Sequence, residues 1–307
     1  MNKTLSIGID LGCTNIKGVL VDQSGTVLLE HKAQTHEHDD RHWKQAVVEM
    51  ISLLESKAAK KVLHVGLAAP GLANADNSCI AFMPGRLPGL ENFDWSTIAA
   101  RRVHVLNDGH AALMAEAAFG AAKDVQHAVL FSLGTGVGGA VLINGKLFQG
   151  SFQMAGHFGH MTVDAHAVSR DVTNMVGSIE DAIGNVSLQA RTYGRYATTD
   201  DLVNDYLGGN VLATWWWLSA VQKLAATVAS TINALSPEVV ILSGGVTQAR
   251  DALLKPLQSF MDLYEWRPAS RKTEIRLAHF SDLAGAIGAA GFALSKNNEH
   301  DSRTTIS

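Results

Sequence analysis

The chain of 307 residues is long enough for about two domains, and its 47% hydrophobic and 18% charged residues are typical of a soluble globular protein. The net charge is −4 and no run of basic residues stands out, so the sequence shows no sign of a surface that binds nucleic acid. No apolar run reaches the ~20 residues of a membrane span, and we therefore expect a cytoplasmic protein. Its two cysteines, Cys13 and Cys79, are too few and too far apart for a disulfide framework or a cysteine zinc site.

Residues 5–28 predict a β-hairpin whose tip consists of small residues. Two apolar runs flank a tight turn from Asp10 to Asn15, and this punctuation is typical of hairpins. Such a tip leaves backbone N–H groups unpaired, and a concavity lined by N–H groups binds anions. Asp10 could hold Mg²⁺ through water, while Thr14 and the turn amides meet phosphate oxygens. For a single copy, a plain turn with Asp as turn former is the simpler explanation.

The same pattern recurs at residues 128–148, with its tight turn from Ser132 to Gly136. Two copies half a chain apart predict a duplicated fold that closes two phosphate turns on one nucleotide. The repetition favours phosphate binding over a plain turn in both copies.

Between the two hairpins, an acid follows a short buried-type strand. The strand over residues 103–106 runs into Asn107, Asp108 and Gly109, and an Ala-rich helix over residues 111–119 follows. Open α/β sheets bind ligands at such strand ends, where Asp108 could accept a proton from a substrate hydroxyl. Taken alone, capping of the helix is the commoner role for an Asp at this position. The His-rich segment 31–42 fits no metal-ligand spacing and indicates a solvated loop.

After the second hairpin, His157 and His160 each follow a glycine, which indicates either close approach to a ligand or a chance pair in a loop. Glu180 begins the next helical pattern, where a first-turn acid is common. A long helix over residues 211–235 contains three consecutive tryptophans. They cannot share one helix face, so at least one meets a loop or a partner subunit.

A buried-type strand over residues 238–242 leads into Gly244 and Gly245. This glycine pair either lets the backbone approach a flat ligand such as adenine or simply turns the chain.

With these elements in order, the chain resembles the ROK family of repressors, uncharacterised reading frames and sugar kinases, which have the actin-like ATPase (ribonuclease H-like) fold. The resemblance covers residues 5–294. It rests on six motifs in family order: residues 10–17, 107–108, 133–139, 159–160, 177–180 and 243–246.

The resemblance implies a duplicated α/β fold of two lobes with a cleft between them. The N-terminal lobe would span residues 1–118 and the C-terminal lobe residues 119–307, with a final helix over residues 283–294 that packs back on the N-terminal lobe. The implied reaction is ATP-dependent phosphorylation of a hexose hydroxyl. Phosphoryl transfer depends mainly on positioning and charge stabilisation, which suits these motifs.

The resemblance also implies a role for each site residue. Asp108 is the general base and Asp10 serves Mg²⁺. The sugar contacts would be Asn107, His160 and Glu180. His157 and Arg86, at positions where the chain departs from the family pattern, are further candidates; Arg86 could contact an anionic or acylated sugar, although a surface arginine is the simpler explanation. The phosphate contacts are Gly12, Thr14, Asn15 and Lys17 in the first turn, and Gly134, Thr135 and Gly136 in the second. Gly244 and Gly245 contact the adenosine.

The chain departs from the family pattern in three places. The usual Glu-x-Gly-His has His157 as its first residue, and Arg86 stands where a loop Asn is common. The three cysteine positions of the family's zinc loop hold Asp171, Thr173 and Ser178. Without those thiolates we expect no structural zinc, so another device, such as the turn over residues 174–179, must hold His160 and Glu180.

Three functions remain open at this point. They are a hexose kinase of glucokinase type, a kinase for an amino or N-acylated hexose such as N-acetylmannosamine, and a low-turnover sugar sensor. Intact Asp10, Asp108 and both turns oppose the sensor. Because four residues precede Leu5, we expect no DNA-binding segment and no nucleic-acid partner. A homodimer is compatible with the tryptophan cluster.

Overall fold

The structure is a computed structural model that describes residues 4–36, 38–58, 61–168, 170–171 and 173–304. The chain forms two compact units. Unit 1 comprises Met1–Asp124, Leu147–Ala155 and His279–Ser307, and unit 2 comprises Val125–Lys146 and Gly156–Ala278. None of the helices in the described ranges combines the length and apolar character that a membrane crossing requires. The expected lobe boundary after residue 118 stays a prediction, because the two units are defined by their internal contacts and not by how they move.

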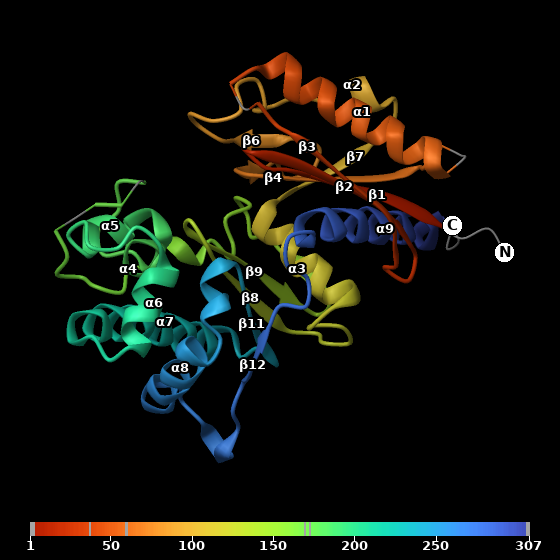
Figure 1. Ribbon diagram of the computed structural model, residues 1–307. Helices are drawn as coiled ribbons and strands as arrows, with labels where there is room; N and C mark the ends of the chain where they lie inside the picture. The colour runs from red at the N-terminus through yellow and green to blue at the C-terminus, as the bar shows by residue number, and fades with distance from the viewer. Residues whose placement is uncertain (1–3, 37, 59–60, 169, 172, 305–307) are drawn as a thin grey trace. The chain divides into compact units, whose positions relative to one another are not determined.

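A five-stranded sheet in the order β3-β2-β1-β4-β7 forms the centre of unit 1 (Figure 1). Its strands are β1 (Leu5–Leu11), β2 (Asn15–Asp22), β3 (Val27–Gln34), β4 (His64–Ala69) and β7 (Val103–Asn107). β1, β2 and β3 are antiparallel neighbours, whereas β4 and β7 run parallel to β1. The carboxyl ends of β1, β4 and β7 therefore lie at one edge of the sheet. The expected loop over residues 31–42 is wrong at both ends, since β3 includes residues 31–34 and helix α1 begins at Asp40.

Helices cover both faces of this sheet (Figure 1). One face carries α1 (Asp40–Ala58) and the short α2 (Ser96–Ala99), and the other carries α3 (Asp108–Phe119) and α9 (Ala284–Thr304). A separate two-stranded sheet, formed by β5 (Leu72–Ala73) and β6 (Ile80–Phe82), comes between β4 and α2 in the sequence. Helix α9 lies unusually close to the strands. A Cβ at Gly66 would be 1.9 Å from the Ala289 carbonyl oxygen, and one at Gly8 would be 1.8 Å from that of Ala286. Glycine at these two positions is what permits the close approach.

The second sheet has the order β10-β9-β8-β11-β12. Its strands are β8 (Ala128–Leu133), β9 (Val137–Ile143), β10 (Lys146–Phe148), β11 (Val239–Ser243) and β12 (Glu274–Leu277). β8 and β9 form the antiparallel hairpin, and β11 and β12 run parallel to β8. The two sheets thus repeat one topology, which confirms the duplicated α/β fold expected from the sequence.

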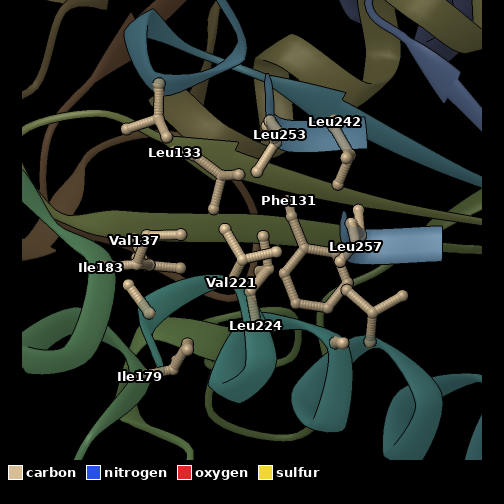
Figure 2. Close-up of a cluster of buried hydrophobic side chains, with 14 of the residues drawn as sticks. Phe131, Leu133, Val137, Ile179, Ile183, Val221, Leu224, Leu242, Leu253 and Leu257 are labelled. Atoms are coloured by element: carbon tan, nitrogen blue, oxygen red, sulfur yellow. The ribbon is translucent and has the colours of Figure 1, made fainter. Parts of the chain in front are cut away.

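The helices of unit 2 surround one apolar core. They are α4 (Ile179–Ile183), α5 (Leu188–Arg191), α6 (Thr199–Leu207), α7 (Val211–Leu235) and α8 (Asp251–Tyr264), with 3₁₀ turns η1 (Phe158–His160), η2 (Asn185–Ser187), η3 (Gly245–Ala249) and η4 (Pro268–Ser270). Figure 2 shows Phe131 and Leu133 of β8 pointing into this core toward Val221 and Leu224 of α7. Ile179 and Ile183 enter the same cluster, and they fix the short helix α4 against the sheet.

The three tryptophans of α7 diverge as the helical periodicity requires. Trp217 is fully buried, and its Nε1 donates a hydrogen bond to the Ala252 carbonyl at 2.9 Å. Trp216 is half-buried and Trp215 is 64% exposed. The expectation that they do not share one face is confirmed.

Candidate active site

The first glycine turn, Gly12–Asn15, is held from one side by the end of β3. The buried Thr35 donates its hydroxyl to the Gly12 carbonyl at 2.6 Å and its amide to the Thr14 carbonyl at 3.1 Å. In a planar trans peptide the C=O and N–H groups point to opposite sides. The N–H groups of Cys13 and Asn15 therefore point away from Thr35. The N–H of Gly12 is not among them, because it donates to the Asn15 carbonyl at 3.0 Å.

The second turn, Gly134–Gly136, is built on the same plan. Its Gly134 and Thr135 carbonyls accept hydrogen bonds from the amides of Asn185 and Val186, at 3.0 and 2.8 Å. By the same peptide geometry, the Thr135 and Gly136 amides point to the opposite side. In both turns, two carbonyl groups that would repel an anion accept hydrogen bonds from a neighbouring segment. The N–H groups of the same peptides point away from that segment, where they could meet an anion.

The Gly244–Gly245 pair lies beside the second turn. β8 and β11 are parallel neighbours in which Ser132 pairs with Ser243, so both strands end at the same edge. Gly244 has φ +92°, and a Cβ there would lie 2.3 Å from the Leu133 carbonyl oxygen. A Cβ at Gly245 would meet nothing within 4 Å, which leaves an open surface beside the turn. Unit 2 thus brings the predicted phosphate turn and the predicted adenosine turn together.

Asn107 and Asp108 follow β7 at the corresponding edge of unit 1. The Asn107 side chain caps α3 by accepting from the Gly109 and His110 amides at 2.8 and 3.4 Å, and its Nδ2 donates to the Gly71 carbonyl at 2.9 Å. The capping role that the sequence offered for Asp108 therefore belongs to the buried Asn107. Asp108 is exposed in the first turn of α3, with Oδ1 accepting from the Gly109 amide at 2.8 Å. Its second carboxylate oxygen is not needed to cap the helix.

Asp10, one residue before the end of β1, lies among other acidic side chains. Burial and the negative charges of Asp108 and Asp282 raise the pKa of Asp10 to about 7, although Lys17 opposes them. A Cβ on Gly285 would lie 2.7 Å from the Asp10 Cγ, so this carboxyl group lies against the first turn of α9. The accumulation of carboxylates fits a bound cation, which would relieve their repulsion. In the part of the chain that the structure describes, no three His, Cys, Asp or Glu side chains form a metal cluster, so a cation here would keep water ligands, as Mg²⁺ commonly does.

Lys17 lies opposite Asp10 in the β1–β2 pair and forms an ion pair with a different acid, Asp282. Its Nζ donates to a carboxylate oxygen of Asp282 and, at 2.9 Å, to the Asp282 carbonyl. This ion pair joins β2 to the segment before α9, 265 positions along the chain. A phosphate contact by Lys17 stays a prediction.

Glu180 of α4 lies between the second turn and the histidine segment. Its Oε2 accepts from the Val137 amide at 2.9 Å. A Cβ at Gly136 would be 2.2 Å from this Oε2, and a Cβ at Gly159 would be 3.3 Å from it. Phe158 stacks on Phe131 with ring centroids 4.4 Å apart and holds the histidine segment on the sheet. Glu180 and the half-buried His157 and His160 are thereby gathered at one place in unit 2.

Two of the residues at the family's cysteine positions, Asp171 and Thr173, are hydrogen-bonded to each other, and the third, Ser178, caps a helix. Asp171 Oδ1 accepts from the Thr173 amide and hydroxyl, at 2.9 and 2.7 Å. Burial disfavours the charge of Asp171, but hydrogen bonds from the Thr173 side chain and from the Met175 and Thr173 amides favour it, and its pKa is lowered. Ser178 caps α4 by accepting from the Asp181 amide at 3.1 Å. Asp171 and Thr173 thus order their own turn, while Ser178 fixes the start of the helix that carries Glu180.

Some functional contacts were beyond the reach of sequence reasoning. Arg86, predicted at the sugar, is an exposed residue between β6 and α2, and its role stays a prediction. Thr35, Asn185 and Val186, which hold the two turns, carry no motif. Asp282 had a weak signal, an acid just before a Gly/Ala-rich helix.

Comparison with known proteins agrees with this geometry. The model of the ROK family matches residues 6–296. A glucokinase of Thermotoga maritima is 27% identical over 94% of this chain and 97% of its own. The ROK hexokinase of Thermus thermophilus, at 24% identity, has a TM-score of 0.84 and covers 96% of this chain and 99% of its own. A ROK family glucokinase of Streptomyces griseus, solved with glucose and AMPPNP, has a TM-score of 0.75 at 23% identity, covering 95% of this chain and 99% of its own. Because the family model matches nearly the whole length of the sequence, this chain belongs to the ROK family.

Proposed function

We propose that the protein is an ATP-dependent kinase that phosphorylates a hydroxyl group of a hexose. The observation that carries the proposal is the shared construction of the two glycine turns. In each, two carbonyls are bound by a neighbouring segment and the following amides point the other way. A pair of such turns suits the phosphates of a nucleotide.

The nucleotide is assigned mainly to unit 2. Gly134, Thr135 and Gly136 bind phosphate oxygens, and the open surface at Gly245 accepts the adenosine. In unit 1, Gly12, Thr14 and Asn15 form the matching turn. Asp10 would hold Mg²⁺ through water, and the ion would supply charge neutralisation at the phosphates.

Asp108 is the general base in this proposal. Its exposed carboxylate removes the proton from the attacking sugar hydroxyl, the hydroxyl oxygen forms a bond to the γ-phosphorus, and ADP leaves. Asn107 keeps the first turn of α3 rigid, and this fixes the direction of the adjacent Asp108 side chain.

Glu180, His157 and His160 are assigned to the sugar hydroxyls. A carboxylate accepts from two adjacent hydroxyls, whereas a neutral imidazole offers one donor and one acceptor. Because His157 replaces a carboxylate of the family pattern, an amino or N-acylated hexose is the second candidate substrate. Arg86 is assigned to the same sugar as a cationic contact.

ADP release measured across a panel of hexoses, hexosamines and N-acylated hexosamines tests the proposal. Turnover with at least one sugar is expected, and binding without turnover of any sugar would refute the kinase. His157→Glu is expected to shift preference toward neutral hexoses. An unchanged profile in that variant means that His157 does not contact the sugar.

We also infer a homodimer, supported by the exposed Trp215 on α7. Light scattering of the purified protein should give twice the chain mass. A mass equal to one chain at micromolar concentration excludes the dimer.

A further inference from the structure

Arg191, the last residue of α5, is a half-buried cation that the proposed reaction does not use. Burial lowers the pKa of its guanidinium to about 10, partly offset by the charge of Asp181. Its Nη1 donates to the Gly184 carbonyl and, at 2.6 Å, to the Ser187 hydroxyl, and its Nη2 donates to the Ile183 carbonyl at 3.4 Å. A buried charge is costly unless it is well bonded, so this arrangement calls for an explanation.

The peptide group between Gly184 and Asn185 links this guanidinium to the second glycine turn. Its C=O accepts from Arg191, while its N–H donates to the Gly134 carbonyl at 3.0 Å. The next amide, of Val186, donates to the Thr135 carbonyl at 2.8 Å. The two segments are also in close contact, since a Cβ at Gly184 would be 3.0 Å from the Thr135 oxygen.

The same segment leads back to Glu180. The Gly184 amide donates to the Glu180 carbonyl at 2.8 Å, which closes the last turn of α4. Figure 2 shows Ile183 and Ile179 of this helix pointing into the core, so α4 is fixed by packing on one side. At the C-terminal end of α4, hydrogen bonds from Arg191 orient the Ile183 and Gly184 carbonyl groups.

We infer that Arg191 is a positioning residue for triphosphate binding: it orients the Gly184–Asn185 peptide, which in turn sets the peptide planes of the Gly134–Gly136 turn. The inference rests on the proposed function, because it takes that turn to meet the β- and γ-phosphates. Arg191 itself touches no substrate. Its planar fork reaches three acceptors from one rigid group, which the single ammonium of lysine does not reproduce.

The test compares Arg191→Met and Arg191→Lys with Arg195→Met, which removes an exposed arginine one turn further along. Binding of AMPPNP and of AMP is measured by calorimetry for each protein. In Arg191→Met the affinity for AMPPNP is expected to fall by about tenfold to a hundredfold, as for a displaced binding group. AMP, which lacks the β- and γ-phosphates, should lose less than about threefold. Arg195→Met should match the parent protein.

A role in stability alone would give a different pattern. Equal losses for AMPPNP and AMP, or no loss for either, overturn the inference. If Arg191→Met does not fold, Arg191→Lys keeps the charge and decides the question: a selective loss of AMPPNP affinity supports the inference, and parent-like binding of both ligands refutes it. Sugar-dependent ADP release by the parent protein is measured in parallel, so failure of the kinase proposal is seen separately.

Discussion

At the scale of single residues, Asn107 and Asp108 divide two roles that their sequence positions left undecided. Asn107 supplies the helix cap and a hydrogen bond to Gly71, while Asp108 stays exposed at the strand end. A cap residue needs β-region backbone and a side chain that reaches back to the helix amides, and Asn107 has φ −63° and ψ 148°. Asp108 is the first residue of α3 and does not serve as its cap, which is compatible with the proposed role as base.

Asp108→Asn tests this division of roles. The amide cannot accept the proton of the attacking hydroxyl, so kcat should fall by about 10²- to 10⁴-fold. Because Asn107 caps the helix, the unfolding temperature and the sugar affinity should stay near those of the parent protein. Steady-state kinetics, sugar titration and thermal unfolding check the three quantities. Near-parent turnover would show that Asp108 is not the base.

Asp171 provides a pH-dependent prediction at the same scale. Its pKa lies below the ordinary 3.8 in the folded protein, so its ionised form stabilises the fold above that pH, and the stabilisation is lost as the pH falls through the lowered value. Asp171→Asn should therefore cost about 1.5 kcal/mol of unfolding free energy at pH 7, as for hydrogen bonds to a charged group. The difference from the parent should shrink below pH ~4.

Urea unfolding at neutral and acid pH measures this difference. Asp124→Asn is the control, since Asp124 is exposed in a turn. A cost that is the same at both pH values would show that the charge of Asp171 does not contribute.

At the scale of elements, the docking of α9 on the first sheet depends on missing side chains. Gly8 and Gly66 face the helix backbone from neighbouring strands, and Gly288 of the helix faces α3, where a Cβ would be 1.7 Å from the Ala111 carbonyl oxygen. Such contacts with backbone atoms cannot be relieved by a rotamer change. In the proposed mechanism the position of α9 matters because its first turn meets Asp10.

Gly66→Ala should therefore destabilise the protein by about 1–3 kcal/mol, the usual cost of overpacking. Gly208→Ala is the matched control, because Gly208 has φ −73° and its nearest Cβ contact would be 3.4 Å. Denaturant midpoints of the two variants are compared with that of the parent. Equal midpoints for both variants would mean that α9 can move away from the new methyl group without a loss in the free energy of unfolding.

At the scale of the whole molecule, one topology is used twice and then specialised. Near its end β1 has Asp10 where β8 has Ser132, so the acid proposed to hold a cation occurs in one copy only. The turn of the first copy is held by Thr35 and that of the second by the η2 amides. Duplication thus supplies the two turns, and different neighbours hold each in place.

The polar residues Asp171, Thr173 and Ser178 lead to a prediction for the intact protein. Because Asp171 already accepts hydrogen bonds from Thr173, and Ser178 caps α4, folding should not depend on zinc. After dialysis against a zinc chelator, the unfolding temperature should be unchanged, and Mg²⁺ alone should restore full ADP release. Elemental analysis that finds one zinc per chain, with a loss of stability on its removal, would contradict this.

Local patterns in the sequence were sufficient for much of the fold. The alternation and turn residues of 5–28 and 128–148 predict two hairpins, and both are present because hairpin pairing is set by neighbouring residues. The helix over Val211–Leu235 was predicted at its observed bounds, since its apolar periodicity is continuous. The strand-end positions of Asp10, Asn107 and Gly244 follow from the same reading.

Contacts between distant segments were decided only by the tertiary structure. Lys17 meets Asp282, Thr35 holds Gly12, and Arg191 supports the second turn through Gly184. None of these pairings has a local signal, because each depends on how helices and strands far apart in the chain pack together. The sequence by itself determined the two turns and the acids beside them, and the packing determined which way each turn's amides point and which of two adjacent residues caps α3.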